Sequence, residues 1–142
     1  MKKWMGSAGI CVNEKNEQLL MVLQGQPHEK KVWSIPSGGK ELNETYEECC
    51  IREISEETGY EVEIVKPLFV KEGNSYGFDV IVHYFEVEIV GGECKIQDPD
   101  ELIHDVAWKS VDDLKELDLS FPEDREYLMS FLQEKVSQKQ LS

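Results

Sequence analysis

The segment GGKELNETYEECCIREISEETGY, at residues 38–60, constrains this chain more than any other part of the sequence, because it holds seven glutamates and one arginine. Thr45 and Glu48 form the T-x-x-E pattern of a capping box, in which each side chain bonds the backbone amide of the other residue. Gly59 stands where a helix commonly ends in the left-handed conformation. The segment therefore predicts a helix that begins at Thr45 and ends at Gly59, and the question is which way its glutamates point.

A helical wheel separates these glutamates into two groups. At about 100° per residue, the face expected to pack on the rest of the molecule carries Tyr46, Cys49, Cys50 and Ile54. Glu53 and Glu57 fall within that arc, and Glu56 lies on its edge. Glu47 and Glu48 lie outside the arc, where a solvated acidic face accounts for them.

The glutamates on the packed face need a partner. Burying ionised carboxylates side by side costs many kcal/mol unless they are paired or bound to a metal. Glu53, Glu56 and Glu57 have the i, i+3 and i+4 spacing that brings side chains together on one helix face. They form a candidate site of hard oxygen ligands suited to Mg²⁺ or Mn²⁺. Arg52 stands beside them and can orient a carboxylate through charge-assisted hydrogen bonds.

The rest of the chain predicts a mixed β-sheet flanked by helices. Apolar, β-prone runs separated by turn signals give expected strands at residues 4–12, 18–24, 61–70 and 78–90, and residues 32–39 are expected to be a short extended piece broken by Pro36 and a Ser-Gly-Gly turn. The expected helices are residues 110–117 and a C-terminal helix from Ser120, for which Ser120 and Glu123 form a second capping box. Ile51 lies opposite the packed face of the acidic helix, so we expect a second layer to cover it. The prediction is one α/β domain over residues 1–142 with α/β/α layering.

Composition and charge exclude several classes of function. Hydrophobic residues make up 40% and charged residues 31%, which is ordinary for a globular protein. The formal net charge of -14 argues against binding a nucleic-acid polymer, because that needs clustered Lys and Arg. No apolar run approaches the roughly 20 residues that span a bilayer, and the apolar segment between Ser7 and Asn13 is too short for a secretory signal. The four cysteines show no zinc or C-x-x-C spacing, which favours reduced structural thiols in a cytoplasmic protein.

Residues 38–60 resemble the Nudix box, G-x5-E-x7-R-E-U-x-E-E-x-G-U, where U is a bulky apolar residue. The matching residues are Gly38, Glu44, Arg52, Glu53, Ile54, Glu56, Glu57, Gly59 and Tyr60. Every fixed letter matches, and only Tyr60 departs from the pattern, being aromatic rather than aliphatic. The flanks are similar too: WSIPSG (33–38) resembles W-x-x-P-G-G with Ser37 for the first glycine, and HDVAWKSVDDL (104–114) resembles a late family stretch in which an acidic residue precedes Trp.

The resemblance implies a Nudix-type α/β/α sandwich and a MutT-like pyrophosphohydrolase that uses Mg²⁺ or Mn²⁺. Its substrate would be a nucleoside diphosphate derivative: a nucleoside triphosphate, a nucleotide sugar or a dinucleoside polyphosphate. Carried over residue by residue, the implied metal ligands are Glu53, Glu56, Glu57 and the carbonyl of Gly38. Arg52 and Glu44 have supporting catalytic roles. A bound cation would also allow so acidic a protein to hold an anionic substrate.

The resemblance leaves the general base open. Family members use either a box glutamate, here Glu53, or an acidic residue on a loop outside the box. The loop candidates in QDPDELIHD are Asp98, Asp100, Glu101 and Asp105. We expect Glu53 to be a ligand or the base, with Glu101 and Asp105 as secondary candidates, although an exposed acidic loop explains these two equally well.

Three aromatic residues are candidates for substrate binding. Trp33, like Trp108, could stack on a nucleobase, although aromatic residues beside a sheet more often belong to the core. Tyr76 lies near the position where dinucleoside-polyphosphate-cleaving members carry a tyrosine, but with five tyrosines in the chain one falls there by chance. An alternative function is a catalytically inactive Nudix-fold module that binds nucleotides or regulates another protein; such modules usually lose box carboxylates that this chain keeps. Several family members are homodimers, and this sequence leaves the oligomeric state open.

Overall fold

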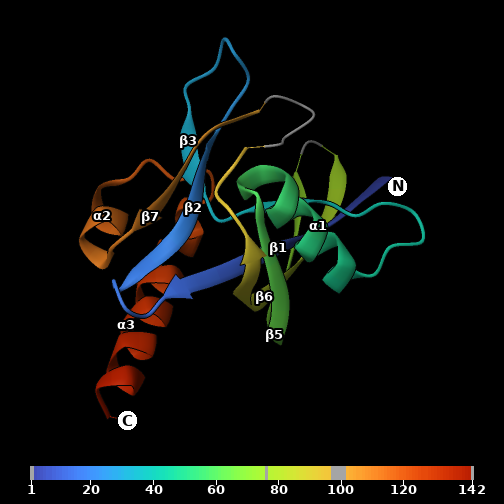
Figure 1. The fold of residues 1–142 in the computed structure, drawn as a ribbon. Helices are drawn as coiled ribbons and strands as arrows, with labels where there is room; N and C mark the ends of the chain where they lie inside the picture. Colours follow the sequence, from blue (N-terminus) through green and yellow to red (C-terminus); the bar gives the residue numbers. More distant parts are fainter. Residues whose placement is uncertain (1, 76, 97–101, 142) are drawn as a thin grey trace.

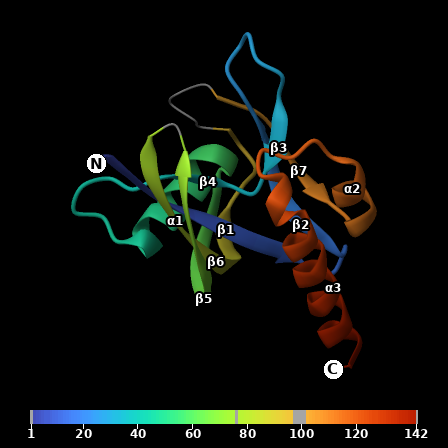
Figure 2. The same cartoon turned by 180° about the vertical axis from the view of Figure 1, so that it is seen from behind.

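The computed structural model describes residues 2–75, 77–96 and 102–141, and within them a mixed sheet lies between helices (Figures 1 and 2). The strands are β1 Lys2–Asn13, β2 Gln18–Gln24, β3 Val32–Ser34, β4 Ser37–Gly39, β5 Tyr60–Ser75, β6 Phe78–Gly92 and β7 Ile103–Lys109. The helices are α1 Tyr46–Thr58, α2 Val111–Glu116, the short 3-10 helix η1 Pro122–Asp124 and α3 Arg125–Leu141. Within the described residues, none of these helices is long and apolar enough to cross a membrane.

The sheet combines parallel and antiparallel pairs. Its order is β3-β2-β1-β6-β5, while β4 pairs with β1 and β7 with β2 outside this path. β1 and β6 run parallel from Lys2 opposite Phe78 to Cys11 opposite Val87, and the remaining pairs are antiparallel. The short strand β4, which comes just before α1 in the chain, is thereby fixed to the central strand β1.

Side chains alternate along the central strands and divide the core in two. One cluster joins β1, β2 and β6 to α2 and α3 through Ala8, Ile10, Leu19, Met21, Tyr84, Leu114, Leu128 and Leu132. The other joins the same strands to α1 through Cys11, Leu20, Phe85, Val87, Cys50 and Ile54. Successive side chains of a strand point to opposite faces of a sheet, so α1 covers one face and α2 and α3 cover the other (Figures 1 and 2). The predicted α/β/α sandwich with a mixed sheet is confirmed.

Helix α1 forms as its caps predict. The Thr45 hydroxyl accepts the amide of Glu48 at 3.0 Å, and the Glu48 carboxylate accepts the amide of Thr45 at 2.9 Å. Gly59 ends the helix with φ of 84°, in the left-handed region. The buried residues of α1 are Cys49, Cys50, Ile54, Glu57 and Thr58. Ile51 is 36% exposed, so the expectation of a second layer over that side of α1 is wrong, because the sheet covers only one face of this helix.

The start of the C-terminal helix differs from the prediction. Pro122 begins η1, and α3 begins only at Arg125, without a side-chain cap at the start of η1. The Ser120 hydroxyl accepts a hydrogen bond from Gln24 at 3.2 Å, and the Glu123 carboxylate lies 3.4 Å from the ammonium of Lys71. The predicted capping box at Ser120 is therefore wrong, because both of its side chains bond to distant strands instead.

One strand is much longer than predicted, and another was not predicted. β5 extends to Ser75, while β6 begins at Phe78 as expected, so the hairpin continues through most of the segment expected to separate the two strands. β7 is a further strand that pairs with β2. Its sequence, IHDVAWK, is short and follows an acidic loop, which hides its β character.

Candidate active site

Arg52 lies at the centre of the acidic segment and contacts carboxylates on both sides of it. Its Nε and Nη2 donate to the two oxygens of Glu44 at 2.7 and 2.9 Å, and Nη2 also donates to the carbonyl of Gly39 at 2.9 Å. Its Nη1 donates to Glu53 at 2.9 Å and to Glu56 at 3.3 Å. A bidentate pair fixes a planar guanidinium group, so Glu44 holds Arg52, and Arg52 in turn holds the two box glutamates.

These contacts also shift the ionisation of the groups involved. The hydrogen bond from Arg52 lowers the pKa of Glu44 to about 2, and the same bond raises the pKa of Arg52. Burial raises the pKa of Glu53 above its usual value, while a hydrogen bond with Glu57 and the charge of Arg52 offset part of that rise. Glu44 is therefore a fixed negative charge at neutral pH, whereas the charge of Glu53 is costly to bury.

The short strand β4 passes directly against the box carboxylates. Glu57 is only 5% exposed, and its carboxylate accepts the amide of Ser37 at 3.3 Å. A methyl group at Gly38 would overlap the carboxylate of Glu53, whose side chain is 14% exposed. The structure thus brings together Gly38, Glu53 and Glu57, which the sequence separates by up to nineteen positions.

These residues fit a hard divalent cation in chemical type. Carboxylate and carbonyl oxygens are the ligands that Mg²⁺ and Mn²⁺ prefer, and the missing side chain at Gly38 leaves room beside Glu53. Within residues 2–75, 77–96 and 102–141, however, no three acidic, histidine or cysteine side chains converge closely enough to hold an ion as they stand. Glu53 and Glu56 pair with Arg52 instead. The assignment of Glu53, Glu56, Glu57 and Gly38 as metal ligands stays a prediction.

A cavity of about 380 Å³ opens beside β4. Its lining includes Trp4, Ile35, Ser37, Lys71, Tyr84 and Phe121. Ser37 connects the cavity to the box, because its amide bonds the carboxylate of Glu57. The volume lies within the range of small-molecule sites.

One wall of this cavity holds a lysine whose position is fixed and whose charge is paired with carboxylates. The ammonium of Lys71 lies 2.9 Å from the carboxylate of Asp124 and 4.7 Å from the ring centroid of Phe121. Asp124 is buried and accepts the hydroxyl of Tyr84 at 2.6 Å. Lys71 is therefore held in one position by contacts from the sheet and from η1, with an ion pair on one side and an aromatic ring on the other.

Sequence reasoning missed the aromatic and basic residues of this cavity. Trp4 is 40% exposed, and its ring occupies the space that a side chain at Gly6 would need. The alternation of Trp4 with Gly6 in β1 was the available signal, since a glycine next to a large exposed ring leaves room for close packing. Lys71 and Phe121 had no such signal, because they are far apart in the sequence and meet only in the fold.

The other sequence-predicted candidates lie elsewhere. Trp33 packs against the core on the α2 and α3 side, with the ammonium of Lys109 4.1 Å from its ring centroid. Asp105 is exposed on β7, and its carboxylate accepts the amide of Val106 at 2.9 Å. Four candidates lie outside the described residues: Tyr76, Asp98, Asp100 and Glu101. The choice between Glu53 and a loop residue as general base stays a prediction.

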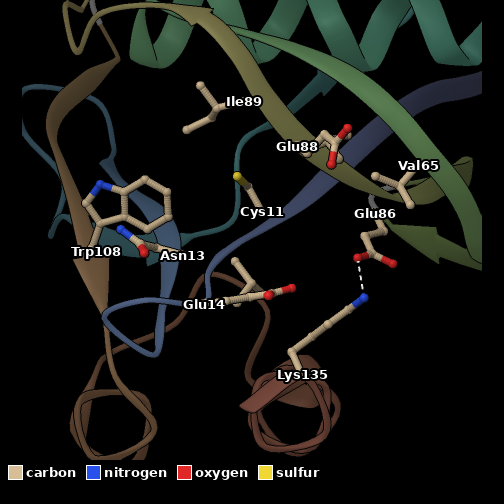
Figure 3. Close-up of a pocket in the computed structure, with 11 residues that line it drawn as sticks. Cys11, Asn13, Glu14, Val65, Glu86, Glu88, Ile89, Trp108 and Lys135 are labelled. Atoms are coloured by element: carbon tan, nitrogen blue, oxygen red, sulfur yellow. Dashed lines mark ion pairs between the residues drawn. The ribbon is translucent and has the colours of Figure 1, made fainter. Parts of the chain in front are cut away.

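A second cavity, of about 550 Å³, contains no box residue (Figure 3). It lies between β6, the turn after β1 and α3, and its labelled residues include Cys11, Trp108 and Glu14. Lys135 of α3 bonds Glu86 of β6 at 2.6 Å on one side of it. The cavity is therefore not part of the site around Arg52.

Comparison with known proteins decides the family. The model of the NUDIX domain matches residues 3–131 of this chain. The chain belongs to the Nudix family. It is 29% identical to "Putative nudix hydrolase 1" of Caenorhabditis elegans over 113 residues, which cover 79% of this chain and 30% of the relative. It is 31% identical to "ADP-ribose pyrophosphatase" of Methanocaldococcus jannaschii over 87 residues, which cover 60% of this chain and 52% of the relative.

A solved structure shows the same fold. The NUDIX hydrolase from Nitrosomonas europaea is similar with a TM-score of 0.77 at 19% identity, over 97% of this chain and 90% of that chain. Against the two curated relatives, by contrast, this chain spans only about a third to a half of their length.

The Nudix box of this chain extends from Gly38 in β4 to Tyr60 at the start of β5. Tyr60, its one departure from the family pattern, packs beside Trp108 with ring centroids 6.2 Å apart and contacts the core cluster of α1. The aromatic ring of Tyr60 is thus part of the packing between α1 and the sheet.

Proposed function

We propose that this domain hydrolyses a phosphoanhydride bond in a nucleoside diphosphate derivative, with Mg²⁺ or Mn²⁺ as cofactor. The observation that carries the proposal is the placement of Glu53 and Glu57 on the inner face of α1, against a glycine whose missing side chain leaves room for the Glu53 carboxylate. Burying these carboxylates is costly without a compensating positive charge. When bound, the cation would neutralise the diphosphate, polarise the attacked phosphorus and lower the pKa of a coordinated water.

The residues of the chain have distinct roles in this proposal. The cation is held by Glu53, Glu56, Glu57 and the carbonyl of Gly38. Glu53 is also the proposed general base for the attacking water, because its carboxylate would lie beside the cation that holds that water. Arg52 orients Glu53 and Glu56, and Glu44 fixes Arg52 through its two oxygens. Most of the rate enhancement would come from positioning and charge stabilisation.

The cavity beside β4 is the proposed binding place for the nucleobase of the substrate. The rings of Trp4 and Phe121 in its lining offer flat apolar surfaces for a planar base. Lys71 supplies a hydrogen-bond donor held in place by Asp124. The cavity adjoins Ser37, so a substrate whose nucleobase is bound there would direct its phosphates toward α1.

The name of one relative sets the order in which substrates are tested. The M. jannaschii relative is named an ADP-ribose pyrophosphatase, so ADP-ribose comes first, followed by nucleotide sugars, nucleoside triphosphates and dinucleoside polyphosphates. The proposed cavity would bind one nucleobase, and all four classes of substrate contain a nucleobase.

The thiols support a reducing compartment for the protein. Within the described residues all four cysteines are free: Cys11, Cys49, Cys50 and Cys94. Disulfides are rare in the cytosol, where thiols are kept reduced. We therefore assign the domain to the cytoplasm as part of the same proposal.

The test is hydrolysis of this substrate panel with Mg²⁺ or Mn²⁺, read by product chromatography. The natural protein is compared with Glu57→Gln, which removes a buried box charge, and with Glu47→Gln, which removes an exposed charge from the same helix. We expect Glu57→Gln to lose at least about 100-fold in turnover, because a direct ligand matters more than the outer-shell partners whose loss costs 10–100-fold. Glu47→Gln keeps its activity, and EDTA abolishes turnover until Mg²⁺ or Mn²⁺ is restored.

Two results would contradict this proposal. Equal turnover by Glu57→Gln and the natural protein would remove the buried carboxylate from the mechanism. A natural protein that neither hydrolyses the panel nor binds Mn²⁺ would be the inactive nucleotide-binding module instead.

A further inference from the structure

Two fully buried polar side chains lie where β1, α1 and β4 meet. Ser7 of β1 and Cys49 of α1 each have 0% exposure. The Ser7 hydroxyl donates to the carbonyl of Tyr46, the first residue of α1, at 2.7 Å. The Cys49 thiol donates to the carbonyl of Gly38 at 3.5 Å. Together these two bonds connect the central strand to the helix and the helix to β4.

The carbonyl of Gly38 has little freedom in this arrangement. Gly38 lies opposite Ser7 in the antiparallel pair of β1 and β4. A methyl group at Gly6 would overlap the Gly38 carbonyl oxygen, and one at Gly38 would overlap the carboxylate of Glu53. The peptide of Gly38 is thus packed from both sides, and the thiol of Cys49 adds a hydrogen bond to its carbonyl beyond the backbone pairing of β4 with β1.

The neighbouring cysteine shows that burial alone does not explain this contact. Cys50 is 1% exposed and packs in the apolar cluster between α1 and the sheet. It behaves there as a small apolar residue. Cys49 differs because its thiol has a specific acceptor, and a buried polar group is retained at low cost only when it is hydrogen-bonded.

We propose that Ser7 and Cys49 are positioning residues that set the direction of the Gly38 carbonyl for the cation of the active site. The proposal rests on the proposed function, because it assigns the carbonyl of Gly38 to that cation. Ser7 acts through α1: it fixes the first turn of the helix against β1, so that Cys49, one turn later, reaches Gly38. Residues that orient metal ligands in this way commonly affect metal affinity without touching the metal.

The test measures Mn²⁺ affinity by electron paramagnetic resonance of free Mn²⁺, together with the melting temperature of the metal-free protein. Cys49→Ala removes the donor, and Cys49→Ser keeps one. Cys50→Ala is the matched control, because it truncates the adjacent buried thiol, which does not contact Gly38. Ser7→Ala removes the hydroxyl that donates to the carbonyl of Tyr46.

We expect Cys49→Ala to weaken Mn²⁺ binding about three- to tenfold, at or below the low end of outer-shell effects because a thiol is a weak donor. Cys49→Ser should stay within about twofold of the natural protein, since a hydroxyl is the better donor. Ser7→Ala should weaken binding in the same direction. Cys50→Ala should lower the melting temperature and leave Mn²⁺ affinity unchanged, which separates positioning from packing.

The outcomes distinguish this inference from the proposed function. If Cys49→Ala binds Mn²⁺ as tightly as the natural protein does, the positioning role is refuted and the proposed function stands. If Cys50→Ala weakens Mn²⁺ binding as much as Cys49→Ala, the effect is general loosening of α1 and the inference is also refuted. If the natural protein binds no Mn²⁺, the proposed function itself fails.

Discussion

Replacing Gly38 with alanine is the most discriminating single change that the structure offers. The backbone of Gly38 is not in the left-handed region, so an alanine can adopt its conformation. The new methyl group would occupy the position of the Glu53 carboxylate. The obstructed atoms are the far end of a flexible side chain, so the expected result is a displaced carboxylate in a folded protein.

The magnitudes separate stability from metal binding. Moving Glu53 away from its preferred rotamer costs roughly 0.5–1.5 kcal/mol, and replacing glycine with alanine at a compatible position stabilises by roughly 0.4–1 kcal/mol. Displacing Glu53 also removes its hydrogen bond from Arg52, worth about 1.5–3 kcal/mol, so the free energy of unfolding should fall by about 1–4 kcal/mol and the melting temperature by about 3–12 °C. Metal affinity should fall at least about 100-fold, or about 2.8 kcal/mol, because a displaced ligand costs more than the 10–100-fold typical of an outer-shell change.

The assay pairs calorimetric melting with Mn²⁺ binding and turnover on the substrate that the panel identifies. Gly91→Ala is the matched control, because its methyl group would meet the carboxylate of Glu61 at 2.6 Å, and Glu61 is an exposed residue just after the box with no role in the proposed metal site. The control should displace a carboxylate without changing Mn²⁺ affinity. Retention of tight Mn²⁺ binding and full turnover by Gly38→Ala would refute the placement of Glu53 and Gly38 at one metal site.

Two further predictions concern groups outside the box. Tyr84→Phe removes the 2.6 Å hydrogen bond to the buried carboxylate of Asp124, so it should cost about 2 kcal/mol, as bonds to charged groups do, and lower the melting temperature by about 6 °C; an unchanged melting curve would show that water replaces the hydroxyl. Cys94 is the exposed thiol of the four, so a thiol reagent should label one group in the native protein and four after unfolding. Rapid labelling of two or more thiols in the native protein would contradict the burial of Cys11, Cys49 and Cys50.

The sequence was sufficient to predict α1 because the signals for this helix are local. Thr45 and Glu48 satisfy each other's amides within one turn, and Gly59 ends the helix with a conformation that other residues rarely adopt. The helical period placed Glu57 among the buried residues, as the structure shows. Local caps and a strong period are the features that tertiary contacts override least.

Features that depend on distant contacts could not be predicted in the same way. The Ser120 pattern is also a local cap signal. The Ser120 hydroxyl, however, accepts a hydrogen bond from Gln24, which lies 96 positions earlier in β2. The cavity beside β4 draws Trp4, Lys71 and Phe121 from three separate segments. Only the fold brings these residues together. The sequence offered Trp33 as a stacking candidate beside the more common core reading, and Trp33 packs against the core.

Arg52 has two opposing effects on the box, and their balance explains the position of Glu44. By bonding Glu53 and Glu56, Arg52 lowers the cost of burying them, but it also occupies oxygens that the proposed cation needs. Only Nη1 makes these two bonds, whereas Nε and Nη2 bond Glu44 and Nη2 also bonds the carbonyl of Gly39. Arg52 can therefore release Glu53 and Glu56 to a cation while the rest of its guanidinium stays fixed. The two bonds from Glu44 to Nε and Nη2 therefore agree with the supporting role proposed for this carboxylate, which would hold Arg52 without being a ligand itself.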